Sequence, residues 1–163
     1  MSSPISLGAA VPAVPVLLSV TGVSVGIYSF VSPNTAIRMF GLPPPAPEKE
    51  STSPHAAAFQ RSVVYAYGIR NVGVSIGQLG LLAFWQFSPI CRASPLAAAV
   101  TKRCLGLCMM LGTVVGLGDA AIIRQFAKDE GVVGEAKAEA TKASINHAVT
   151  AVLIFATGVF LYL

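Results

Sequence analysis

The stretch Tyr65–Gln78, with the sequence YAYGIRNVGVSIGQ, decides the fold because it places Arg70 inside a long apolar run. Residues 62–87 are otherwise largely apolar, and the run is long enough to cross a bilayer. An arginine at the centre of a membrane-spanning helix costs about 2.5–3.5 kcal/mol even on insertion scales. Such a residue therefore needs a partner inside the protein, and it usually has a functional role.

The polar side chains of this stretch share one face of the predicted helix. At 3.6 residues per turn, the opposite face consists mostly of Ile, Val, Leu and Gly. The pattern predicts that the polar face forms one wall of a site inside a small helical membrane protein. Its members are Tyr67, Arg70, Asn71, Ser75 and Gln78.

The composition of the whole chain agrees with a membrane protein. Of its 163 residues, 54% are hydrophobic and only 11% are charged, whereas soluble domains carry about 25% charged residues. The length predicts a single domain over residues 1–163. The net charge is +4, but no basic cluster with interleaved aromatic residues occurs, so we expect no nucleic-acid partner. The three cysteines lack the spacing of a metal site, and we expect neither a metal nor another cofactor.

Four apolar runs are long enough to cross a bilayer, at about 20 residues per span. We therefore predict an all-α protein, folded as an antiparallel four-helix transmembrane bundle. Because the first three runs each contain a Gly-x-x-x-Gly pair (Gly22/Gly26, Gly73/Gly77 and Gly112/Gly116), we expect these glycines to let the helix backbones approach closely. The predicted spans are residues 14–31, 62–87, 104–123 and 145–163.

The segments between the spans carry most of the charge. Residues 35–40 are predicted to form a short interfacial helix with Arg38 directed outward and Met39 and Phe40 toward lipid. Residues 43–58 are predicted to form a flexible loop. Residues 88–103 and 124–144 are predicted to be loops, with a surface helix at 133–143. Lys and Arg are more frequent on the face that carries the first and third loops. The positive-inside rule places that face in the cytoplasm and both termini on the opposite side.

The depths of two charged residues in the membrane predict that they meet. Arg70 comes eight residues into the second span, about 12 Å below the cytoplasmic face at 1.5 Å per residue. Asp119 comes fifteen residues into the third span from the other side, which leaves it about 8 Å from the same face of a 30 Å core. Tyr28 and His147 come at a similar level. We therefore predict an Arg70–Asp119 ion pair within a cluster of polar groups.

A carboxylate held by an arginine predicts acid–base chemistry. Asp119 can take a proton from water or from a substrate hydroxyl, while Tyr67 or His147 donates one. These groups suit the opening of an epoxide, the cyclisation of an oxygenated lipophilic intermediate, or an isomerisation, without a metal or a nucleotide. We expect the remaining polar residues to contact the substrate. They are Tyr65, Asn71, Ser75, Gln78 and Tyr28.

A second interpretation is that the protein is not an enzyme. Buried ion pairs often fix helix register and contribute little net stability. The protein is then a membrane scaffold or partner subunit in which Arg70 and Asp119 only hold the helices together. A small transporter is less favoured, because the sequence contains no repeat with interrupted helices.

Short motifs distributed over nearly the whole chain resemble a family of small four-span integral membrane proteins of unknown function that is frequent in fungi. The motifs are Ser32-Pro33, FGLP at 40–43, YGIRN at 67–71, GDA at 118–120 and His147. The size and the Asp/Arg pair are also similar to small membrane epoxide hydrolases and cyclases of fungal polyketide and meroterpenoid pathways.

The second resemblance implies a general base at Asp119, positioned by Arg70, and an acid at Tyr67 or His147. It implies a function in secondary metabolism, with a lipophilic small molecule as substrate. We expect a multi-pass protein of the endoplasmic reticulum or another endomembrane, surrounded by lipid. Its possible protein partners are further copies of the chain or other enzymes of the pathway.

Overall fold

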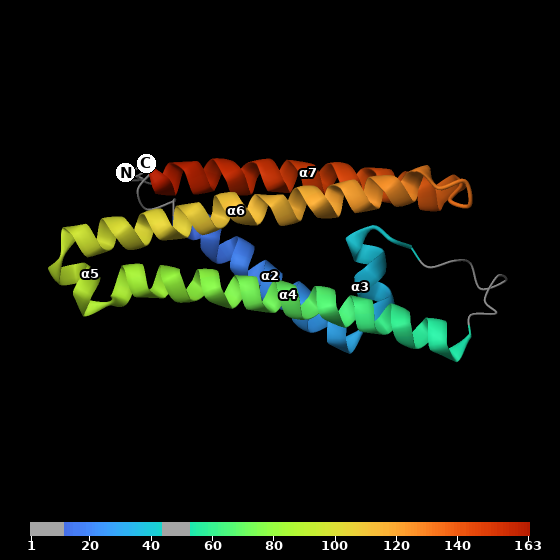
Figure 1. Cartoon of the computed structure of the whole chain (residues 1–163), viewed down its shortest axis with the longest axis horizontal. Coiled ribbons are helices and arrows are strands. Elements are labelled where there is room, and N and C mark those ends of the chain that lie inside the picture. The colour runs from blue at the N-terminus through green and yellow to red at the C-terminus, as the bar shows by residue number, and fades with distance from the viewer. Residues whose placement is uncertain (1–11, 44–52) are drawn as a thin grey trace, which may run out of the picture.

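The computed structural model describes residues 12–43 and 53–163, and every regular element in these residues is a helix. Two short helices are α5 (Pro89–Ala93), at one end of the molecule, and α3 (Pro33–Phe40), in the other half (Figure 1). The predicted all-α class is therefore confirmed for the described part of the chain. The long helices are α2 (Ala13–Val31), α4 (Pro54–Phe87), α6 (Pro95–Lys128) and α7 (Gly134–Tyr162).

Ser-Pro pairs set the starts of two long helices. The Ser53 hydroxyl accepts a hydrogen bond from the Ala56 N–H at 3.2 Å, and the Ser94 hydroxyl accepts one from the Ala97 N–H at 3.3 Å. Each serine caps its helix, and the proline that follows already has a helical φ and lacks the N–H that would have no partner there. As a result α4 begins eight residues before the predicted span, and α6 begins nine residues before its own.

The predicted loops are correspondingly too long. The flexible loop predicted at 43–58 is wrong for residues 54–58, which are helical, while residues 44–52 lie outside the described part. The loop predicted at 88–103 contains α5 and the first turns of α6. The surface helix predicted at 133–143 is the first part of α7, which continues without a break into the fourth apolar run.

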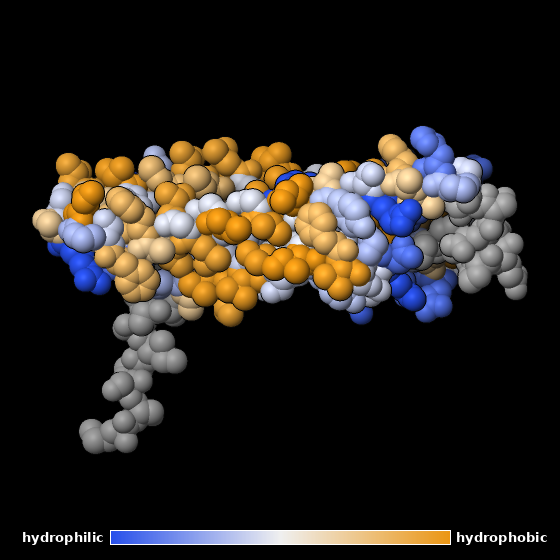
Figure 2. Space-filling view, turned by 90° about the horizontal axis from the view of Figure 1, so that it is seen from below, coloured by the Kyte–Doolittle hydropathy of each residue, from blue (hydrophilic) through white to orange (hydrophobic). Residues whose placement is uncertain are grey.

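Three helices of the described residues, α2, α6 and α7, are long and apolar enough to cross a membrane, rather than the four that were predicted. The missing one is α4, because the polar residues at 70, 71 and 78 lower its hydropathy. Large apolar side chains are exposed along the candidate spans, including Leu17 at 66% and Val114 at 70%. They contribute to an apolar surface over the middle of the molecule, with hydrophilic residues toward both ends (Figure 2). These features are compatible with a multi-pass membrane protein.

Helices α6 and α7 pack closely along their lengths in opposite directions. Ile123 lies in one apolar cluster with Ala140, near the connection between the two helices. Near their other ends, a Cβ added to Gly106 would lie 2.6 Å from the carbonyl oxygen of Gly158. Since no side chain fits between backbones at this distance, the two glycines allow the closest approach of α6 and α7.

Helices α2 and α4 form a second antiparallel pair. A Cβ on Gly26 would lie 2.7 Å from the carbonyl oxygen of Gly68, and a Cβ on Gly22 would collide with the Ser75 hydroxyl. The Gly22/Gly26 pair therefore serves as predicted. The pair Gly73/Gly77 does not, because no atom lies within 4 Å of a Cβ at either position. A Cβ on Gly112 also meets open space, whereas one on Gly116 would lie 3.1 Å from the Ala151 methyl group.

Alanine at position 73 or 77 should leave the stability unchanged or raise it by up to about 1 kcal/mol, because alanine favours the helix and meets no neighbour. Gly26→Ala should lower the stability, because its methyl group would press against the backbone of α4. The measurement is the free energy of unfolding in detergent micelles. A loss of stability in Gly73→Ala or Gly77→Ala would show that this face of α4 is covered.

The two helix pairs touch less extensively than the helices within each pair. At one end, Leu82 of α4 packs against Leu105 and Met109 of α6 and Leu161 of α7. Nearer the other end, the contact between α4 and α6 is polar. The space between these two contacts is therefore where a site can form.

Candidate functional site

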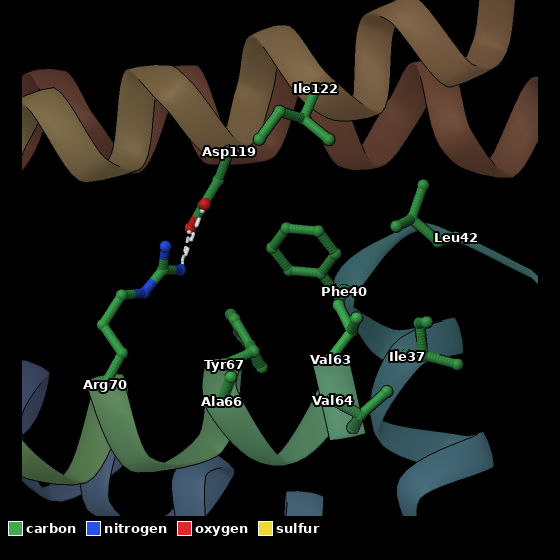
Figure 3. A pocket seen from close by; sticks show the side chains of 10 residues that line it. All are labelled: Ile37, Phe40, Leu42, Val63, Val64, Ala66, Tyr67, Arg70, Asp119 and Ile122. Carbon is green, nitrogen blue, oxygen red and sulfur yellow. Dashed lines mark hydrogen bonds and ion pairs between the residues drawn. The ribbon is translucent and has the colours of Figure 1, made fainter. Parts of the chain in front are cut away.

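The polar contact between α4 and α6 is the predicted ion pair. Nη2 of Arg70 lies 2.9 Å from Oδ2 and 3.1 Å from Oδ1 of Asp119 (Figure 3). The side chain of Asp119 is 10% exposed and that of Arg70 is 39% exposed. The predicted meeting of the two charges is thus observed, with a single guanidinium nitrogen shared between both carboxylate oxygens. Within the described residues, no other group accepts a hydrogen bond from this guanidinium.

Three aromatic rings lie beside the ion pair. Tyr67 is one turn before Arg70 on α4, and its ring centroid lies 5.2 Å from the guanidinium carbon. The ring of Phe40 is 4.8 Å from the Tyr67 ring and 5.1 Å from the ring of His147. The prediction that Phe40 points toward lipid is therefore wrong. The residue after Phe40 is Gly41, which ends α3 with a φ of 107° and lies against Ala143 of α7 and Ile123 of α6.

A central cavity of about 380 Å³ lies between the two helix pairs, with walls from α2, α4, α6 and α7. The whole polar face predicted for residues 67–78 lies on its wall, and Asp119 and His147 face it from the other pair. The residues predicted from helical periodicity and depth are thus brought together. The polar side chains that line the central cavity are Thr21, Tyr67, Arg70, Asn71, Ser75, Gln78, Asp119, His147 and Thr150.

Two amides of α4 show how polar groups are held at this depth. Gln78 accepts a hydrogen bond at 3.1 Å from the hydroxyl of Ser19 on α2, so it has the interhelical partner that its position requires. Nδ2 of Asn71 is buried and has no partner among the described residues. Ser19 was not among the residues predicted for the site, although it lies on the small-residue face of α2 with Gly22 and Gly26.

Two tyrosines that we expected to contact a substrate lie elsewhere. Tyr65 stacks on Phe30 of α2, with ring centroids 5.3 Å apart and an interplanar angle of 25°. Tyr28 is exposed, and neither tyrosine lines the central cavity. Both tyrosines lie at a suitable level along their helices. Each lies on another side of its helix than the cavity-facing residues, so its side chain points away from the cavity.

A second hollow, the lateral pocket, has a volume of about 370 Å³ and lies between α3, α4 and α6. Tyr67, Arg70 and Asp119 line it at one side, as they line the central cavity. The ion pair therefore borders both hollows, and Figure 3 shows it at the edge of the lateral pocket. The other residues that line the lateral pocket are apolar: Ile37, Phe40, Leu42, Val63, Val64, Ala66 and Ile122.

This arrangement offers groups for proton transfer. Asp119 can accept a proton, Tyr67 can donate one, and Arg70 can stabilise a developing negative charge. No group of three His, Cys, Asp or Glu side chains suited to a metal ion occurs in residues 12–43 and 53–163. The carboxylate, the phenol and the guanidinium supply acid–base and electrostatic chemistry.

These features define a helical protein, compatible with a multi-pass membrane protein, whose helices enclose an ion pair between an apolar pocket and a polar cavity. Residues 19–161 match the family described as Domain of unknown function (DUF4267), and the chain belongs to this family. The predicted membership of a family of unknown function is thereby confirmed. A search of the curated proteins and a search of the solved structures each gave no match.

Proposed function

We propose that this protein is a membrane-embedded acid–base enzyme that opens or cyclises an oxygenated lipophilic small molecule, in the manner of an epoxide hydrolase or cyclase. The observation that carries this proposal is the position of Asp119. Its carboxylate lies between an apolar pocket and a polar cavity, held by one nitrogen of Arg70. An ion pair that served only to join helices would need neither hollow.

In the proposed reaction, Asp119 acts as general base and Tyr67 as general acid. Asp119 takes a proton from water or from a hydroxyl of the substrate, and the oxygen of that group forms a bond to an epoxide carbon. The bond between this carbon and the epoxide oxygen breaks, and the epoxide oxygen receives a proton from Tyr67. Transfer of the proton from Asp119 to the tyrosinate restores both groups.

Tyr67 is the better candidate for the acid than His147. Tyr67 lines the lateral pocket together with Arg70 and Asp119. His147 lines only the central cavity, and the ring of Phe40 lies against it on the side of the lateral pocket. A lipophilic substrate in the lateral pocket is therefore nearer to the tyrosine.

We also propose that α4 crosses the membrane with the three candidate spans, which gives an antiparallel four-helix transmembrane bundle in the endoplasmic reticulum or another endomembrane. Ile69 and Ile76 of α4 are 60% and 57% exposed, which suits a lipid-facing surface. The polar face of α4 from Tyr67 to Gln78 lines the central cavity, where water or other helices can satisfy its polar groups. A fungal source and a place in secondary metabolism belong to the same proposal and rest on the resemblance given above.

The experiment that tests the proposal is turnover of a panel of lipophilic epoxides by the purified protein in vesicles, followed by mass spectrometry of diols and cyclic ethers. Asp119→Asn preserves the shape of the side chain but removes the base, so we expect the rate to fall about 10²- to 10⁴-fold. Glu139→Gln, which changes a half-buried carboxylate paired with Arg38, is the matched control and should retain full activity. Undiminished turnover by a folded Asp119→Asn variant would exclude the proposed base.

A second candidate function, a non-enzymatic scaffold or partner subunit, is favoured by a different observation. The ion pair joins two helix pairs that otherwise touch mainly near Leu82. Arg70 and Asp119 would then only hold the two helix pairs together. This interpretation predicts that a chain with leucine at both positions keeps its function, because neither charge is left without a partner.

A further inference from the structure

We propose that the lateral pocket binds a neutral amphiphile, which places one hydrogen-bond-accepting oxygen at Arg70 and its hydrocarbon part between α3, α4 and α6. This inference rests on the proposed function in that it names the substrate class of the same site. The classes of molecule that fit are ketones, ethers, epoxides, esters and alcohols with a sizeable apolar portion.

The apolar lining of the lateral pocket indicates that the ligand has a hydrocarbon part. Apart from Tyr67, Arg70 and Asp119, all the lining residues are apolar. Two of them, Val63 and Ile122, are 50% and 58% exposed, so they form part of the outer surface as well as the pocket wall. In a bilayer such a surface faces lipid, and a lipophilic molecule can reach the pocket laterally without passing through water.

The N–H groups of Arg70 that have no partner indicate the polar group of the ligand. The guanidinium carries five N–H groups, and within the described residues only Nη2 has a partner. Arg70 also lines the pocket itself. An acceptor oxygen on the ligand satisfies N–H groups that would otherwise lack a partner in apolar surroundings.

The charge of Asp119 excludes an anionic ligand. Asp119 already neutralises Arg70, and its side chain is only 10% exposed. A carboxylate or phosphate on the ligand would bring a second negative charge beside this carboxylate at low dielectric, where like charges repel strongly. A neutral oxygen accepts from the guanidinium without this repulsion.

The test uses 4-hexylbenzophenone, a neutral photoreactive ketone, with the full chain in phosphatidylcholine vesicles. After irradiation, mass spectrometry locates the labelled residues, and labelling in the pocket is divided by labelling at lipid-facing Ile76 to correct for partition into the bilayer. We expect Val63 and Ile122 to be labelled at least tenfold above Ile76. The anionic analogue 4-benzoylbenzoate should label the pocket no more than Ile76, and equal pocket labelling by both probes would overturn the neutral-ligand assignment.

Two matched variants locate the site. Ala66→Phe fills the lateral pocket and should lower the labelling ratio at least tenfold, whereas Gly112→Leu fills the central cavity and should leave it unchanged. If Ala66→Phe does not fold, competition by unreactive hexyl phenyl ether in the wild-type protein provides the same readout. Labelling that persists in Ala66→Phe or under competition, or that disappears in Gly112→Leu, would overturn the proposal.

The labelling experiment does not depend on turnover, so it separates this inference from the proposed enzyme function. Labelling of the pocket in a chain that converts no epoxide would support the proposed binding site and contradict the proposed enzyme function. Turnover of epoxides without labelling of the pocket would contradict the proposed binding site and support the proposed enzyme function.

Discussion

Arg70→Leu should destabilise the protein by about 3–5 kcal/mol, the loss typical of a buried ion pair that loses one partner. The reason is that the variant leaves the carboxylate of Asp119 at 10% exposure without its cation. The carboxylate can reduce this loss only by taking up a proton or by drawing water from the central cavity. The free energy of unfolding in mixed micelles, followed by helical circular dichroism, measures the change.

Asp119→Leu should cost less, about 1–3 kcal/mol. The side chain of Arg70 is 39% exposed, and its long stem can carry the charge toward a wetter position when the carboxylate is absent. The double variant should be more stable than Arg70→Leu by about 1–4 kcal/mol, because it buries neither charge. Destabilisation that is simply the sum of the two single variants would contradict a coupled ion pair.

The same three variants separate the two functional interpretations. An enzyme that uses Asp119 as a base should lose turnover in Asp119→Leu and in the double variant. The double variant should lose turnover even though it is more stable than Arg70→Leu. A scaffold should lose function in the single variants and regain it in the double variant. Stability and function therefore change in parallel only if the pair is structural.

The ion pair could be predicted from the sequence because it depends on two regular quantities. The rise of 1.5 Å per residue gives the depth of each charge in its span, and a charge in an apolar run requires a partner. The 3.6-residue period likewise placed Asn71, Ser75 and Gln78 on the wall that they occupy. Depth alone does not give the direction of a side chain, and for this reason it did not indicate that Tyr28 and Tyr65 lie away from the central cavity.

Contacts set by distant parts of the chain could not be predicted in this way. Phe40 lies against His147 because α3 folds back toward α7, where Arg38 also contacts Glu139 at 2.9 Å. This hydrogen bond raises the pKa of Arg38 above its ordinary value. On the alkaline side, the stabilisation by this raised pKa is therefore lost only as the pH rises through the pKa of Arg38, in strong alkali. Residues 101 positions apart form this link, and no local pattern indicates it.

The spacing of the glycines predicted only some of the close contacts between helices. The Gly-x-x-x-Gly pattern identifies small residues on one face of a helix, but it does not show which face meets a neighbour. Gly22 and Gly26 meet α4, whereas Gly73 and Gly77 meet nothing within 4 Å. The closest approach of α6 and α7 uses Gly106 and Gly158, which have no paired glycine four residues away.

Gly158→Leu should be the most destabilising glycine substitution, at about 3 kcal/mol or more, because the new side chain overpacks the closest contact between two helices. A Cβ at this position would lie 2.8 Å from the carbonyl oxygen of Gly106 and 2.9 Å from the backbone nitrogen of Met110. Both atoms belong to the backbone of α6, so they cannot rotate away. The helices must separate, and they then lose packing along a contact that extends toward Ala151 and Gly116.

Gly77→Leu is the matched control for this substitution. It gains the same helix propensity, about 1 kcal/mol, but its side chain enters open space. We expect its free energy of unfolding to equal or exceed that of the wild-type protein, so the difference between the two variants isolates the α6–α7 contact. Cysteine cross-linking between positions 116 and 151 provides an independent measure, because it should fall in Gly158→Leu and remain in Gly77→Leu. Equal stability of the two leucine variants would mean that α6 and α7 are not in close contact at Gly106.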